Sequence, residues 1–571
     1  MGYTFKFKKI FYILYVVLFV GFFFLGGECF LATAYFLTHS SKFSTLQNAE
    51  STYPRNPEEY IKIAIFGESA AAGYPSGKGF SKIIEYEFKK TYPQAKLYIK
   101  NYSQPGYPFY RHQVQAVKQV IDKYDILLIY AGNNEANNYL DDSGYFRKIQ
   151  YRNNKTLAPF KKENNLSHFL ESKSRIYCLI KKAHNKFVKP YVKAMRRNYY
   201  RYWRFEEFES TRVLPEDEIV KISINFEKEI EEIAGLARKY AKHIIISNVP
   251  TYETWKPFFS VKKLDLAKED VELFEKDYDF GLLYYNQKDY KKAKEYFLKA
   301  YEIDGHVAIL NYMIGYSYLT IGDTKRGHQF LIRGIDDDGY PIRALSPLSN
   351  IAKKISDKYD NIHFIDTIKN FQDLSDSTTT YKELFYDLQH PSLLGHIIIA
   401  YNFLNKIAEV EPDKFNYFQY NYFELNSADF NSLLKHYKKQ LNIDDNEESW
   451  DALMIARWHI SMAALSAYPD AFLNFAKDNI HLFFEKSDKD ANDKATMLIF
   501  SALLESGRIN SDIQKALMLV NQALKLSPDY VKEILYRKMA LADLIIDKLN
   551  GIGIFYSHQK KSFILKNKPD R

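Results

Sequence analysis

Short apolar, β-branched runs recur along the first half of the chain and end at small or polar residues. The first runs from Ile61 to Phe66 and stops at Gly67. Residues 95–102 and 126–130 have the same character. Runs of this length, bounded by glycine or turn residues, are typical of buried strands. We therefore expect three strands in these positions.

Stretches with helical periodicity separate these runs and predict helices over residues 79–91 and 109–123. Two further strand-like runs follow at 243–247 and 362–366, and residues 392–407 have the pattern of a closing helix. Alternating strands and helices favour a parallel sheet that is covered on both faces. The predicted fold class is therefore α/β, a three-layer domain over residues 61–408.

Two stretches predict helical additions to this domain. The pattern Gly281, Tyr284 and Ala293 belongs to a segment whose first half recurs 34 residues later, at 315–323. This period resembles that of tetratricopeptide repeats, and it places an inserted repeat pair at 265–338, between the fourth and fifth strands. Two repeats rarely bury enough core alone, so they should pack on the rest of the chain.

Residues 409–571 show degenerate helical patterns of the same kind, and we expect an all-α region there. Repeat helices often form grooves that bind a protein partner. The alternative is a helical scaffold that only braces the α/β domain. The sequence favours neither.

The amino-terminal stretch predicts a membrane anchor. Residues 10–27 carry no charge and would span about 27 Å as a helix, close to the thickness of a bilayer core. Apolar character resumes after Glu28 and continues to Leu37. We expect an uncleaved transmembrane signal-anchor at 10–37, followed by a linker at 38–60. The alternative is a signal peptide that is cleaved near Ala34.

Lysines at positions 6, 8 and 9 precede this apolar stretch. Basic residues flanking a span favour the cytoplasmic side. Residues 1–9 are therefore expected in the cytoplasm and the rest of the chain outside it. In a Gram-negative bacterium that position is the periplasmic face of the inner membrane.

Composition adds three limits. The chain has 571 residues, 46% of them hydrophobic, which is enough for more than one packed unit. The net charge of +9 is modest for this length and does not indicate a nucleic-acid partner. The two cysteines are Cys29, inside the apolar stretch, and Cys178. With no Cys/His cluster at zinc spacing, we expect no metal and no cofactor.

Candidate chemistry lies where the predicted strands end. Ser69, Gly106 and Asn134 follow the first three strands, and Asp387 stands three residues before His390 far downstream. Ligand sites of open α/β sheets lie at the carboxyl ends of strands. A serine needs a base before it can act as a nucleophile, and a histidine oriented by a carboxylate can supply one.

Each of these blocks alone has a structural explanation. Ser69 could cap a helix, Gly106 could serve only a turn, and Asn134 could cap a loop. His390, which precedes a proline, could be a surface loop residue. It is their joint occurrence, in one order along the chain, that favours a functional interpretation.

The four blocks in this order resemble the SGNH (GDSL-type) serine hydrolases, whose name is spelled by the residue types of Ser69, Gly106, Asn134 and His390. The resemblance implies Ser69 as nucleophile, His390 as base and Asp387 as the group that orients it. It also implies an oxyanion hole formed by the backbone N–H groups of Ser69 and Gly106 and the side-chain amide of Asn134.

Two positions depart from the family pattern. Glu68 stands where the first block usually has Asp, and Glu135 stands where the third block usually has Asp. Neither position carries the nucleophile or the base, so we expect activity to survive. The departures leave the substrate preference open.

A long segment at 136–214 interrupts the domain after the third strand. Within it, residues 181–205 contain nine Lys or Arg residues, no acidic residue and many interleaved aromatic residues. One hypothesis is that this basic and aromatic insertion lies beside the site and meets an anionic glycan or the membrane surface. The alternative is a solvated basic helix surface.

Together these observations predict a membrane-anchored hydrolase, a serine esterase that cleaves O-acyl and foremost O-acetyl ester bonds outside the cytoplasm. The family resemblance implies small esters, lipase-like lipid substrates or acylated glycans. Two alternatives stay open: an O-acyltransferase, and a catalytically inactive repeat scaffold that binds glycan.

Overall fold

The structure is a computed structural model, and it describes parts of the chain. The described residues are 54, 57–106, 109, 113–136, 216–240, 242–258, 260, 266–377, 379–463, 466, 468, 470–486, 490–505, 513–531, 554–557 and 562–565. Apart from the first few, they all belong to one compact unit formed by residues 59–150 and 208–571. The predicted anchor at 10–37 and the basic stretch at 181–205 lie outside the described residues.

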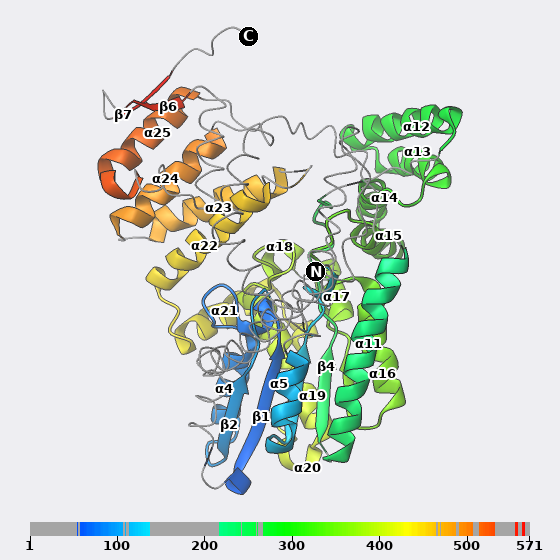
Figure 1. Cartoon of the computed structure of the whole chain (residues 1–571), viewed down its shortest axis with the longest axis vertical. Coiled ribbons are helices and arrows are strands. Elements are labelled where there is room, and N and C mark those ends of the chain that lie inside the picture. Colours follow the sequence, from blue (N-terminus) through cyan, green and yellow to red (C-terminus); the bar gives the residue numbers. More distant parts are fainter. Residues whose placement is uncertain are drawn as a thin grey trace, which may run out of the picture. The chain divides into compact units, whose positions relative to one another are not determined.

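A parallel five-stranded sheet is the centre of this unit (Figure 1). The spatial order is β2-β1-β3-β4-β5, and every pairing is parallel. Every residue of β3 is buried, which explains why the sequence shows unbroken apolar runs instead of alternation. The predicted parallel sheet is confirmed. The strands are β1 (Tyr60–Gly67), β2 (Lys96–Asn101), β3 (Ile126–Tyr130), β4 (His243–Ser247) and β5 (Ile362–Ile365).

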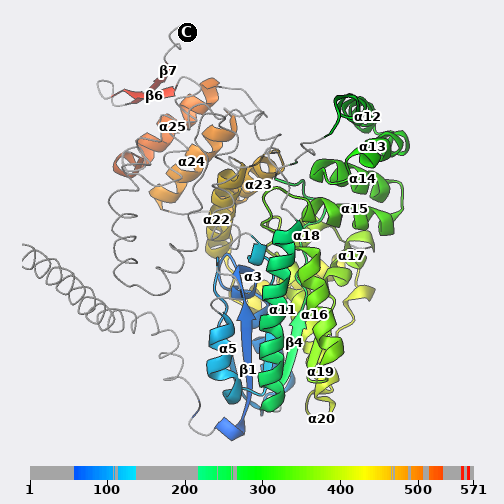
Figure 2. The same ribbon diagram turned by 45° about the vertical axis from the view of Figure 1, so that its right-hand side comes forward.

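Helices cover both faces of the sheet (Figures 1 and 2). One face carries α4 (Phe80–Thr91) and α19 (Leu393–Val410), which pack on each other. The other carries α5 (Val114–Val120), α11 (Glu216–Lys239) and α16 (Ser346–Lys358). The shorter helical elements among the described residues before α21 are η1 (Pro57–Glu59), α3 (Ser69–Ala72), η3 (Ile121–Lys123), α17 (Thr367–Ser377), α18 (Tyr381–Leu384), α20 (Pro412–Phe415) and η7 (Tyr422–Glu424).

The inserted repeat pair forms two helical hairpins between β4 and β5: α12 (Lys268–Asn286) with α13 (Tyr290–Ile303), and α14 (Ala308–Thr320) with α15 (Thr324–Asp336). The 34-residue period has a packing cause. A Cβ on Gly281 would lie 2.3 Å from the Phe297 ring, and one on Gly315 would lie 2.8 Å from Leu331. Each glycine therefore lets two helices of a hairpin approach closely.

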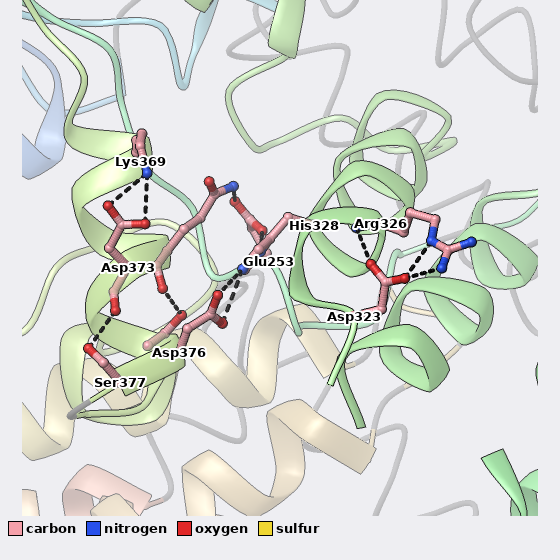
Figure 3. A network of polar contacts seen from close by, with 10 residues as sticks. Glu253, Asp323, Arg326, His328, Lys369, Asp373, Asp376 and Ser377 are labelled. Atoms are coloured by element: carbon pink, nitrogen blue, oxygen red, sulfur yellow. Dashed lines mark hydrogen bonds and ion pairs between the residues drawn. The ribbon is translucent and has the colours of Figure 1, made fainter. Parts of the chain in front are cut away.

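A buried histidine joins the second repeat hairpin to the α/β domain (Figure 3). His328 of α15 lies between two carboxylates, with Nδ1 2.6 Å from Glu253 and Nε2 3.2 Å from both oxygens of Asp376. Glu253 follows β4 and Asp376 belongs to α17. We call these three residues the His328 cluster. A neutral imidazole has only one N–H donor, so only the charged form of His328 can donate to both carboxylates.

The C-terminal part contains α21 (Ser427–Gln440), α22 (Asp445–Ala463), α23 (Asp470–Lys486), α24 (Ala491–Glu505) and α25 (Ile513–Leu526). The helices α22 with α23, and α24 with α25, form the closest contacts there. The prediction of an all-α region was wrong in one respect. Strands β6 (Ile554–Ser557) and β7 (Ser562–Leu565) form an antiparallel pair, and each contains a run of aromatic and β-branched residues, at 554–556 and 563–564, that favours strand structure.

Among the described helices, none combines the length and the apolar character needed to cross a bilayer.

Candidate active site

The site begins where β1 gives way to the short helix α3. Gly67 ends the strand, and a Cβ there would lie 2.2 Å from the carbonyl oxygen of Tyr130, so no larger residue fits this turn. The side-chain amide of Gln113 holds this last strand residue, since it accepts from Gly67 N–H at 2.6 Å and donates to Gly67 C=O. Ser69 is thereby fixed as the first residue of α3.

Ser69, His390 and Asp387 form one line of hydrogen bonds. The Oγ atom of Ser69 lies 2.7 Å from Nε2 of His390, and Nδ1 of the same ring lies 2.6 Å from Oδ2 of Asp387. All three are buried, with 7%, 4% and 1% of the residue exposed. The cap position before α3 belongs to Glu68, so Ser69 is not a helix cap. The structure thus brings together three residues that are up to 321 positions apart.

The charge state of Asp387 fixes the direction of these bonds. Burial alone would raise the pKa of Asp387, but the charge and hydrogen bond of His390 outweigh it, and the pKa lies below its usual range. Oδ1 also accepts from the backbone N–H groups of Gln389 and His390, at 2.8 and 2.7 Å. An ionised carboxylate accepts from Nδ1–H, which leaves Nε2 as the acceptor for the Ser69 hydroxyl.

Glu68 holds the loop after β3 against the Ser69 turn. One oxygen accepts from Gly132 N–H at 3.2 Å, and the other accepts from the N–H groups of Asn133 and Asn134, both at 3.0 Å. Burial outweighs these three bonds and raises the pKa of Glu68 to about 7. Glu68, which stands where the resembled family usually has Asp, therefore fixes the backbone of residues 132–134.

Asn134 and Gly106 lie in the loops that follow β3 and β2. Asn134 is buried in the loop after β3, beside Glu68. Gly106 lies in an exposed turn after β2, with φ +77°, a backbone conformation that favours glycine. That turn follows a segment tied to the first strand, since Gln104 N–H donates to Gly67 C=O at 3.1 Å. Both loops therefore reach the strand edge that carries Ser69.

Aromatic residues from two distant segments cover the imidazole. The ring of Tyr74 lies 4.3 Å from that of His390, centroid to centroid, and the ring of Trp458 lies 6.1 Å away and is nearly perpendicular. Tyr74 follows α3, whereas Trp458 belongs to α22. Burial, with the negative charges of Asp387 and Asp451, raises the pKa of Tyr74, which stays a neutral phenol.

Sequence reasoning missed four contributors: Glu68 as the support of the Asn134 loop, Gln113, Tyr74 and Trp458. Glu68 was noticed only as a departure from the family. Gln113 and Trp458 lie in helical patterns that carry no local signal of chemistry. Tyr74 could have been proposed from the sequence, because it follows Ser69 by only five positions, in a Gly-Tyr-Pro sequence.

Comparison with known proteins gives three findings. The family model described as tetratricopeptide repeat matches residues 278–306. No protein with a curated description matches the chain. Two solved structures of an acetyl xylan esterase from Geobacillus stearothermophilus, both variants, align with TM-scores of 0.26 and 0.24. Their identities are 14% and 13%, over 61% of this chain and 95% and 94% of theirs.

Proposed function

We propose that this protein is a serine esterase of the SGNH type. The observation that carries the proposal is the buried line from Ser69 Oγ through His390 to Asp387, with bonds of 2.7 and 2.6 Å. A buried serine in direct contact with an imidazole, which is itself oriented by an ionised carboxylate, is the arrangement of an activated nucleophile.

The reaction follows from these roles. His390 Nε2 takes the Ser69 proton while Oγ attacks the ester carbonyl, and the same proton then passes to the leaving alcohol. Water then cleaves the acyl-Ser69 ester: His390 takes a proton from the attacking water and returns it to Oγ of Ser69 as the acid leaves. Asp387 stabilises the imidazolium in both steps.

The carbonyl oxygen becomes negative in each transition state and needs preorganised donors. We assign this role to the backbone N–H groups of Ser69 and Gly106 and the side chain of Asn134. Support comes from the loops that meet at this strand edge and from the Glu68 bonds that fix the Asn134 loop.

A short acyl group suits the site best. Ser69 and His390 are 7% and 4% exposed, so the acyl chain has little open surface to occupy. We therefore propose O-acetyl esters as the foremost substrates, with acylated glycans as the natural class. The sequence of residues 1–37 supports an anchor that places the site outside the cytoplasm.

The decisive experiment uses the full chain in detergent. A fluorophosphonate probe should label the wild type, and p-nitrophenyl acetate should be turned over. Ser69→Ala should abolish labelling and lower turnover by at least about 10³-fold. A folded wild type that neither reacts with the probe nor releases nitrophenol would leave the inactive glycan-binding scaffold as the better interpretation. Deacylation that accelerates with an added alcohol acceptor would favour an acyltransferase.

A further inference from the structure

The hairpin of α22 and α23 shares a hydrophobic core with the loop that carries His390. Leu388, two residues before His390, is fully buried in a cluster with Trp255, Phe258 and Phe472. Phe472 comes from α23, and Trp458 of α22 packs against the same cluster. The C-terminal helices are therefore built into the site.

The loop that carries Tyr74 is also tied to α22. Lys78 donates to the carbonyl oxygen of Asn442 at 2.8 Å and forms an ion pair with Glu447 of α22. The hydroxyl of Tyr74 lies 3.5 Å from the carbonyl oxygen of Met454, also on α22. The loop that carries Tyr74 is thus held against α22, the helix that carries Trp458.

The rings of Tyr74 and Trp458 are more exposed to solvent than the three hydrogen-bonded residues of the site. Ser69, Asp387 and His390 are buried, whereas Tyr74 and Trp458 are both partly exposed. In the proposed reaction His390 hands its proton to the leaving alcohol, so the alcohol part of an ester must lie on the open side of His390. That side is where the two aromatic rings stand.

We propose that Tyr74 and Trp458 form the subsite for the alcohol part of the substrate and select a sugar ring there. This inference rests on the proposed function and deepens it. The C–H face of a pyranose is flat and apolar and packs on aromatic rings, whereas its hydroxyl groups can stay in water. A small aliphatic alcohol makes little such contact. Trp458, 389 positions after Ser69 in the chain, is then a specificity-determining residue.

The test compares two acetates that differ only in the alcohol, ethyl acetate and an acetylated xylo-oligosaccharide. Trp458→Ala should raise KM for the sugar acetate about tenfold, as expected for a lost ring contact, and should lower kcat/KM for the sugar acetate about tenfold more than kcat/KM for ethyl acetate. Trp458→Phe should keep KM for the sugar acetate close to the wild-type value, because a ring contact is retained. Trp450→Ala is the matched control, because Trp450 is an exposed residue of the same helix.

A binding measurement keeps this proposal separate from the esterase proposal. Titration calorimetry of the acetylated oligosaccharide into Ser69→Ala protein, with and without Trp458→Ala, needs no turnover. A Kd that rises about tenfold supports the subsite even if the wild type proves inactive. Equal losses on both acetates, an unchanged sugar KM, or no binding by folded Ser69→Ala protein would each overturn it.

Discussion

At the scale of single residues, the site depends on a carboxylate that keeps one tautomer of His390 in place. Asp387 accepts from the imidazole and from two backbone N–H groups, so it orients the ring and its own loop together. An amide in its place could donate to Nδ1 and would then favour the wrong tautomer. The acidic side chain is required for its charge as well as its shape.

We therefore predict that Asp387→Asn lowers kcat for p-nitrophenyl acetate on the order of 10³–10⁴-fold with little change in KM. The melting temperature of the variant should stay near that of the wild type, because Asn has nearly the same size as Asp and its side-chain oxygen can still accept from the two backbone N–H groups. Steady-state kinetics across pH and a thermal melt check both parts. A variant with near wild-type kcat would show that His390 needs no ionised partner.

Glu68 acts through the loop that it holds. Removing its side chain leaves the N–H groups of Gly132, Asn133 and Asn134 without their acceptor in a buried place. Each unsatisfied donor costs roughly 1–3 kcal/mol. We predict that Glu68→Ala lowers the free energy of unfolding by several kcal/mol and lowers turnover as Asn134 moves. Urea unfolding measures the first effect, and an unchanged midpoint would contradict the role given to Glu68.

At the scale of elements, the His328 cluster gives the repeat pair a pH-dependent attachment. Burial alone would lower the pKa of His328, but its bonds to Glu253 and the charges of Glu253 and Asp376 raise it. Arg343 and Tyr381, from neighbouring elements, interact electrostatically with Glu253. On α17, the other charged residues are Lys369 and Asp373, which are paired with each other (Figure 3). A raised pKa in the folded state means that protonation favours folding.

The contribution of His328 is thus complete below its unfolded pKa of about 6.5 and is lost as pH rises through the higher folded value. We predict that the melting temperature of the wild type falls between pH 6.5 and 9 more steeply than that of His328→Gln. His306→Gln is the control, because His306 has a 70% exposed side chain and pairs with Asp337 at the surface. Parallel curves for wild type and His328→Gln would refute this attachment.

The elements also show what sequence could and could not supply. All five strands were predicted to within one residue at each end, because parallel strands covered on both faces leave continuous apolar runs. The repeat pair was visible because Gly281 and Gly315 each allow a close helix contact at the same place in the repeat. The β6–β7 pair was missed, since its strands have only four residues each and lie outside the strand–helix alternation that made the equally short β5 recognisable.

The site divides in the same way. Ser69, Gly106, Asn134, Asp387 and His390 are recognisable because their types and order repeat a known pattern. Trp458 could not be found, since its role depends on where α22 packs, and that contact is set by buried side chains such as Phe472 and Leu388. Tertiary packing leaves no periodic signal at a single position.

At the scale of the whole described unit, the shared core of α23 and the His390 loop makes stability and activity inseparable. Phe472 is fully buried in that core, whereas Phe484 on the same helix is 42% exposed. We predict that Phe472→Ala lowers the free energy of unfolding by about 3–5 kcal/mol, as expected for a large buried side chain. Phe484→Ala should change it by less than about 0.5 kcal/mol.

Phe472→Ala should also lose esterase turnover at temperatures where it remains folded. The substitution leaves a cavity in the cluster against which Trp458 and the His390 loop pack, so both can shift. Denaturant unfolding and p-nitrophenyl acetate kinetics on the two phenylalanine variants measure this. Full activity in a destabilised Phe472→Ala protein would mean that the C-terminal helices stabilise the fold without shaping the site.

The 321 positions between Ser69 and His390 also matter while the chain is being made. A ribosome adds about 5–20 residues per second, so roughly 16–64 seconds pass between synthesis of the nucleophile and synthesis of its base. The four strands β2 to β5 and the whole repeat pair are made in that interval, and α22 follows later still. A nascent chain therefore carries an inert serine, and its reactivity appears only after nearly all of the surrounding structure has been translated.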